Sequence, residues 1–77
     1  MSIRTTVRVR GEVATGAHAV EAKLRYRSPA VAATVSATDA GFELRLAEPA
    51  FGVAPGQTAV LYEADAVVGA GVIVSAH

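Results

Sequence analysis

Residues 20–27, VEAKLRYR, have the most regular pattern in this 77-residue sequence. Apolar and charged side chains alternate there, with the charged set being Glu21, Lys23, Arg25 and Arg27. Successive side chains of a β-strand point to opposite faces of a sheet. The stretch therefore predicts a strand with one buried face and one charged face.

The same alternation recurs along the rest of the chain. It predicts further strands at residues 5–13, 31–36, 42–46, 58–63 and 66–74. Turn-forming residues separate them at 14–17, Ser28-Pro29, 38–41, Glu48-Pro49, 54–57 and 64–65. We expect Glu48-Pro49 to end its strand, and Ala54-Pro55-Gly56-Gln57 to form a type II turn. Six short strands without a predicted helix indicate an all-β fold, either a small antiparallel barrel or a two-sheet sandwich.

The last two predicted strands differ from the others because both of their faces are largely apolar. Residues 66–74 contain no charged side chain and include Gly69 and Gly71. Strands of this kind are either covered on both sides or await a partner. The glycines indicate a bulge, a barrel corner or the close approach of another backbone.

Composition limits the function classes. The length predicts a single domain over residues 1–77, and the 52% apolar content argues against disorder. With no cysteine, the chain has no disulfide, thiolate metal site or thiol nucleophile. Seven basic and seven acidic residues exclude a strongly basic nucleic-acid module but allow a local basic face. No apolar run approaches the ~20 residues of a membrane span, and nothing predicts a signal peptide, so we expect a cytoplasmic protein.

Residues suited to catalysis or to metal and cofactor binding are scarce. His18 and His77 are isolated from each other and from any paired carboxylate, so we expect neither a metal site nor a catalytic residue. Gly69-Ala70-Gly71 lacks the third glycine of a dinucleotide-binding fingerprint, because Val74 stands at that position. A structural role for these glycines is the better interpretation.

The basic residues carry the main functional hypothesis. Lys23, Arg25 and Arg27 share one strand face, and Arg8 and Arg10 share another. If these strands pair antiparallel, the five cations line one side of the sheet and can hold a phosphate backbone. The alternative is a solvated face on which Glu12, Glu21 and Glu43 are cross-strand partners. Tyr26 points to the opposite face, so the basic set lacks a stacking aromatic residue.

Two segments near the end of the sequence resemble a known family. Residues 51–62, FGVAPGQTAVLY, and 68–73, VGAGVI, resemble the end of the bacterial tRNA-specific 2-thiouridylases, the MnmA/TrmU family. That family carries Val-x-Pro-Gly-Gln-x-x-Val-Phe-Tyr followed by Leu-Gly-Gly-Gly-x-Ile. Residues 22–27 are similar to its Val-Lys-x-Arg-Tyr-Arg strand, and 31–35 and 42–49 agree in order and spacing. Here Leu61 replaces the Phe and Ala70 the middle glycine.

The resemblance implies the last of three domains, a six-stranded antiparallel β-barrel like domain 2 of elongation factors. It also implies that the chemistry lies elsewhere, in an ATP-pyrophosphatase domain that activates the wobble uridine and in two cysteines that carry sulfur. This sequence has no Ser-Gly-Gly-x-Asp loop and no cysteine. We therefore expect no cofactor in this chain, ATP belonging to the family's catalytic domain, and no activity from the chain alone.

The function implied by the resemblance is accessory. The domain would help to hold tRNA for 2-thiolation, with Lys23, Arg25 and Arg27 contacting phosphates. The Pro55-Gly56-Gln57 turn would shape the barrel rim. The apolar last two strands would pack against the preceding domain in a full-length enzyme, whereas a stand-alone chain would bury them in its own barrel or in a homo-oligomer. The alternative, favoured by the zero net charge, is a protein-docking or dimerisation module without RNA binding. An enzyme in its own right is disfavoured by the missing nucleophiles and ligands.

Overall fold

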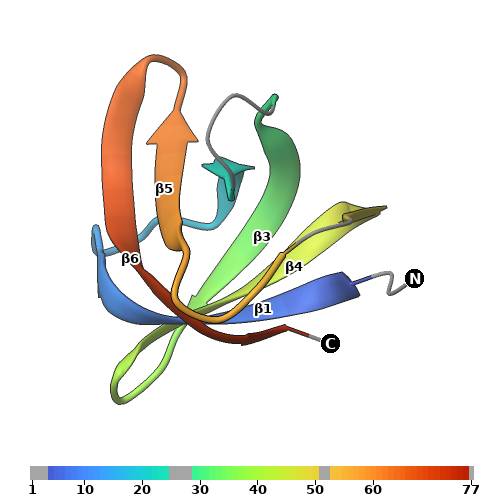
Figure 1. The fold of residues 1–77 in the computed structure, drawn as a ribbon. Helices are drawn as coiled ribbons and strands as arrows, with labels where there is room; N and C mark the ends of the chain where they lie inside the picture. Colours follow the sequence, from blue (N-terminus) through green and yellow to red (C-terminus); the bar gives the residue numbers. More distant parts are fainter. Residues whose placement is uncertain (1–3, 25–28, 51–52, 77) are drawn as a thin grey trace.

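The computed structural model describes residues 4–24, 29–50 and 53–76, which form six β-strands (Figure 1). The strands are β1 (Arg4–Val13), β2 (Ala19–Lys23), β3 (Val31–Ala37), β4 (Gly41–Ala50), β5 (Thr58–Glu63) and β6 (Ala66–Ala76). The described residues contain no helix. The all-β prediction is therefore confirmed.

The six strands close into a barrel in the order β1-β4-β3-β2-β5-β6. Every neighbouring pair is antiparallel, including the pair of β1 with β6 that closes the ring. Closure gives each strand two hydrogen-bonded neighbours, so no backbone edge is left open to aggregation. A barrel, rather than a two-sheet sandwich, is the fold.

The prediction that Glu48-Pro49 ends the fourth strand was wrong, because β4 continues to Ala50. Arg4 and Thr6 are two positions apart on β1, whereas their partners on β4, Ala50 and Arg45, are five positions apart. The register shift leaves extra β4 residues without regular ladder partners. Pro49 lies within this irregular stretch, where its missing N–H costs no ladder hydrogen bond.

The inner faces of the strands form one apolar core. The buried side chains are Val7, Val9, Val20, Ala22, Leu24, Ala33, Val35, Phe42, Leu44, Leu46, Val53, Ala59, Leu61 and Ile73. No polar or charged side chain is buried among the described residues. Burial alternates along the strands as the sequence predicts, so the charged residues of β1, β2 and β4 lie on the outside of the barrel.

Glycines allow β1, β4 and β6 to approach one another closely. A Cβ on Gly11 would lie 2.1 Å from the carbonyl oxygen of Ala70, and one on Gly71 would lie 2.3 Å from that of Arg10. A Cβ on Gly41 would lie 2.1 Å from the carbonyl oxygen of Val9. At Gly71, then, the close approach of another backbone is what requires glycine, and this packing permits the tight coiling of the closed barrel.

Candidate nucleic-acid interface

Arg8 and Arg10 extend from the outer face of β1, because Val7 and Val9, which alternate with them, point into the core. Both arginines are exposed. Their strand lies between β4 on one side and β6 on the other. The outward residues of β4 and β6 therefore decide which side chains lie beside Arg8 and Arg10.

The pairing of β1 with β2, on which the five-cation surface depended, does not occur. β1 pairs with β4 and β6, whereas β2 pairs with β3 and β5. Ring closure places β1 and β2 on opposite sides of the barrel. Lys23, half-buried on β2, is therefore remote from Arg8 and Arg10. Arg25 and Arg27 lie outside the described residues.

The cation that shares a wall with Arg8 and Arg10 is Arg45, exposed on β4. Its backbone partners are Thr6 on β1 and Thr34 on β3. The alternation of β4 already placed Arg45 on an outer face, but only the pairing of β1 with β4 brings it beside the β1 arginines. We call Arg8, Arg10 and Arg45 the basic wall.

One acidic residue lies within the basic wall. Glu43 is directly opposite Arg8 across the β1–β4 pair, and the Arg8 Nε lies 3.5 Å from the Glu43 Oε2. An exposed ion pair of this kind contributes roughly 0–1 kcal/mol to stability. Neither Arg10 nor Arg45 forms an ion pair with another described residue. Both arginines are exposed and can therefore reach a ligand.

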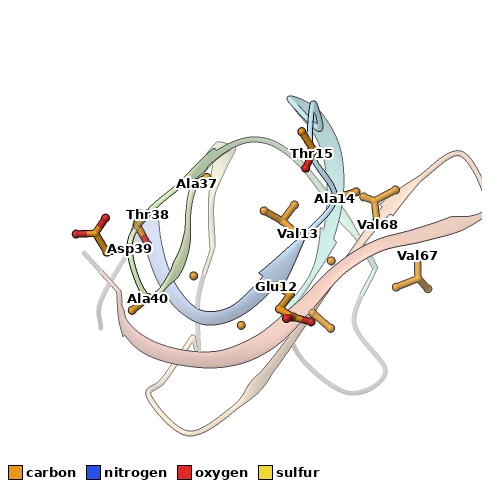
Figure 2. Close-up of a pocket in the computed structure, with 14 residues that line it drawn as sticks. Glu12, Val13, Ala14, Thr15, Ala37, Thr38, Asp39, Ala40, Val67 and Val68 are labelled. Atoms are coloured by element: carbon orange, nitrogen blue, oxygen red, sulfur yellow. The ribbon is translucent and has the colours of Figure 1, made fainter.

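The barrel has an acidic end, formed where the turns after β1 and β3 line one hollow. Glu12 and Asp39 are exposed at or beside these turns. An open hollow of about 820 Å³ lies there, lined in part by Glu12, Thr15, Thr38 and Asp39. Figure 2 shows Thr38 and Asp39 on one side of it, with Val13 and Val68 across from them. Negative charge at this end disfavours a phosphate there, whereas the basic wall is compatible with an anion.

Residues 54–57 form the predicted turn. Gly56 has a φ of +93°, and the Gln57 N–H donates to the Ala54 carbonyl at 3.3 Å, as a type II turn requires. The Gln57 side chain accepts a hydrogen bond from the Ala54 N–H at 3.1 Å. Two further hydrogen bonds join the turn to Ile73 on β6. The Gly56 N–H donates to the Ile73 carbonyl at 2.9 Å, and the Ile73 N–H donates to the Gln57 carbonyl at 2.8 Å. Pro55, Gly56 and Gln57 are thus arranged to hold the end of the barrel together.

No metal-binding cluster is found among the described residues, where no three His, Cys, Asp or Glu side chains are grouped to hold an ion. His18 is exposed beside the β1–β2 turn. No helix within the described part of the chain has the length and apolarity to cross a membrane.

Comparison with known proteins gives a consistent match. The family model of the aminomethyltransferase beta-barrel domain matches residues 2–73. The tRNA-specific 2-thiouridylase MnmA of Cupriavidus taiwanensis is 47% identical over 66 residues, which is 84% of this chain and 18% of that protein. The MnmA of Deinococcus radiodurans is 53% identical over 55 residues, 70% of this chain and 14% of that protein.

The chain thus corresponds to less than a fifth of the length of these relatives. The match to the family model extends over nearly the whole chain, and the barrel agrees with the description of that model. The chain therefore belongs to the aminomethyltransferase beta-barrel domain family, and within it matches the C-terminal domain of the tRNA-specific 2-thiouridylases.

Proposed function

We propose that this barrel is a non-catalytic accessory domain of a tRNA 2-thiouridylase and helps to hold tRNA while the wobble uridine is thiolated. The observation that carries the proposal is the basic wall, three exposed arginines on the adjacent strands β1 and β4. Membership of the family supports the choice of tRNA as the ligand, because the relatives are named tRNA-specific 2-thiouridylases. ATP binding, sulfur transfer and a cytoplasmic location belong to the whole enzyme in this proposal.

The basic wall suits a phosphate backbone for geometric reasons. Arg8 and Arg10 are two residues apart on one strand, so their side chains emerge roughly 7 Å apart on the same face. Arg45 extends the row onto the neighbouring strand. Each guanidinium can donate two hydrogen bonds to a phosphate, and the exposed hydroxyls of Thr34 and Ser36 on β3 supply further donors.

The number of cations predicts how binding depends on salt. If all three arginines neutralise phosphates, the logarithm of the affinity should fall with the logarithm of salt concentration with a slope of about −2 to −3. Raising the salt from 50 to 200 mM would then weaken binding by roughly 16- to 64-fold. A module that binds protein through apolar contacts would show little such dependence.

Fluorescence anisotropy with a folded tRNA at these two salt concentrations tests the proposal. We expect the double variant Arg10→Gln, Arg45→Gln to lose most of the affinity and to lower the salt slope by about 2. The matched control is Ala14→Asp, Thr15→Asp, which lowers the net charge equally but at the exposed β1–β2 turn of the acidic end. Full binding by the first variant, or equal loss in both, would overturn the assignment of the basic wall.

Lys23, Arg25 and Arg27 remain a separate prediction for the phosphate contact. The variant Arg25→Ala, Arg27→Ala addresses it in the same titration. Loss of binding in this variant with full binding by Arg10→Gln, Arg45→Gln would move the site to the segment after β2. Loss in both would mean that the tRNA contacts two sides of the barrel.

The second candidate function is a protein-docking or dimerisation module without RNA binding. The zero net charge and the exposed valines of β6 favour it. Absence of tRNA binding at 50 mM salt, with the fold intact by circular dichroism, would select this function over the first.

A further inference from the structure

The outer side of the β5–β6 hairpin is a continuous apolar surface. Val67, Val72 and Val74 of β6 are 60%, 48% and 49% exposed, and they are the exposed large hydrophobic residues of the described chain. Half-buried Val60 and Tyr62 of β5 pair with Ala70 and Val67 of β6. We call Val60, Tyr62, Val67, Ala70, Val72 and Val74 the apolar face. No charged residue interrupts β6 over its 11 positions.

The barrel cannot cover the apolar face itself. β5 and β6 each have both neighbours in the closed ring, and their inner side is occupied by buried Ala59, Leu61 and Ile73. The expectation that a lone barrel would bury this hairpin internally therefore does not hold for its outward valines. A group of large apolar side chains in water marks an interaction site.

We infer that the apolar face is the surface on which the rest of a 2-thiouridylase chain docks against this domain. The inference rests on the proposed role of the barrel as one part of that enzyme. In the relatives, more than four fifths of the polypeptide lies outside the matched segment, so a large partner is available within the same chain. A second copy of the barrel is the competing occupant.

The place where the polypeptide enters the barrel supports the rest of the enzyme as the docking partner. Near the start of β1, Val7 pairs with Ala76 at the end of β6, and Figure 1 shows both termini on one side of the barrel. Polypeptide that precedes a C-terminal domain therefore arrives beside the Val74 end of the apolar face. It can reach that face without a long linker.

The rim of the apolar face indicates the chemistry of the docking partner. Lys23 pairs with Val60 on one side, and Arg10 pairs with Val72 on the other. We expect the partner to present an apolar centre with at least one acidic residue opposite Lys23. Arg10 belongs to the basic wall as well, so tRNA held there would lie next to the docked part of the enzyme.

Cysteine reactivity can test the docking, because the chain has no cysteine of its own. Val72→Cys is made in the 77-residue chain and in a chimera in which this chain replaces the matched segment of the C. taiwanensis MnmA. Alkylation rates are measured peptide by peptide by mass spectrometry. The matched control is Ser36→Cys, exposed on β3, which is not a neighbour of β5 or β6 in the ring.

We expect alkylation of Val72→Cys to be at least tenfold slower in the chimera than in the isolated chain, with Ser36→Cys changed less than twofold. Equal rates for Val72→Cys in both proteins would overturn the inference. Protection already present in the isolated chain, and growing with its concentration, would assign the face to a second copy instead.

Two further arms keep the result decisive. A second chimera uses the D. radiodurans MnmA. Failure of both chimeras to fold would count against the inference, because the remaining part of neither enzyme would then pack against β6 of this chain. Adding Arg8→Gln and Arg45→Gln to the chimera should weaken tRNA binding while leaving Val72→Cys protected. Docking and tRNA binding can therefore fail independently of each other.

Discussion

Arg10 on β1 lies directly opposite Val72 on β6, so the basic wall and the apolar face meet along the line where these two strands pair. Antiparallel partners have Cβ atoms about 5 Å apart, which makes Arg10 a neighbour of both surfaces. A ligand on the basic wall and a partner on the apolar face would touch or nearly touch at this line. In the proposed function, the barrel would hold an RNA against another part of the enzyme at this line.

The ion pair between Arg8 and Glu43 should limit RNA binding. Replacing Glu43 with Gln removes a negative charge beside the basic wall and releases Arg8 for a phosphate. We expect Glu43→Gln to raise tRNA affinity severalfold at 50 mM salt and to change stability by less than about 1 kcal/mol. Anisotropy titration and urea unfolding measure the two effects. Weaker binding by this variant would show that the RNA does not lie on this wall.

The close backbone approach at Gly71 predicts a large cost for a single methyl group. The added Cβ in Gly71→Ala would meet the Arg10 carbonyl oxygen at 2.3 Å, so β1 and β6 would have to separate. We expect a loss of about 1–3 kcal/mol or more in the free energy of unfolding. Gly16→Ala is the control, because Gly16 has open space around it and only its φ of +87° opposes a side chain. Urea melts in which Gly71→Ala is as stable as the native chain would contradict the strand geometry.

The core of this small barrel should tolerate little truncation. Phe42 is fully buried, and Phe→Ala in a core costs about 3–5 kcal/mol. A 77-residue domain has a total stability of roughly 4–12 kcal/mol. Phe42→Ala should therefore lower the thermal midpoint drastically or leave the chain largely unfolded, as followed by circular dichroism. The exposed counterpart Val72→Ala should change stability by less than about 0.5 kcal/mol.

The side chain of Gln57 should act as a hydrogen-bond acceptor rather than as an RNA contact. Gln57→Leu removes the bond from the Ala54 N–H and should cost about 0.5–1.5 kcal/mol. Gln57→Glu keeps an acceptor oxygen and should retain most of the stability. The two variants are compared by chemical unfolding, and tRNA affinity should stay unchanged for Gln57→Leu. Equal destabilisation by both would show that the acceptor is not what matters at this position.

Most of the local structure could be predicted from the sequence. Alternation along β1 and β3 predicted their positions to within one residue, because burial of one face imposes period two on a strand. The turns that bound the apolar runs of β5 and β6 predicted these two strands to within two residues. The turn at residues 54–57 was equally predictable, since proline presets φ at its second position and Gly56 supplies the positive φ of its third. These features depend on neighbouring residues only.

The partners of each strand and the composition of the basic wall were decided by the tertiary structure alone. The alternation of β1 does not determine that its neighbours are β4 and β6. For that reason the predicted pairing of β1 with β2 was wrong. Ring closure joined Arg45 to Arg8 and Arg10, separated Lys23 from them, and let β4 continue past Pro49 through an irregular register. Sequence patterning determines which face of a strand is buried. Which strands meet depends on closing one ring around a shared core, a constraint that acts over the whole chain at once.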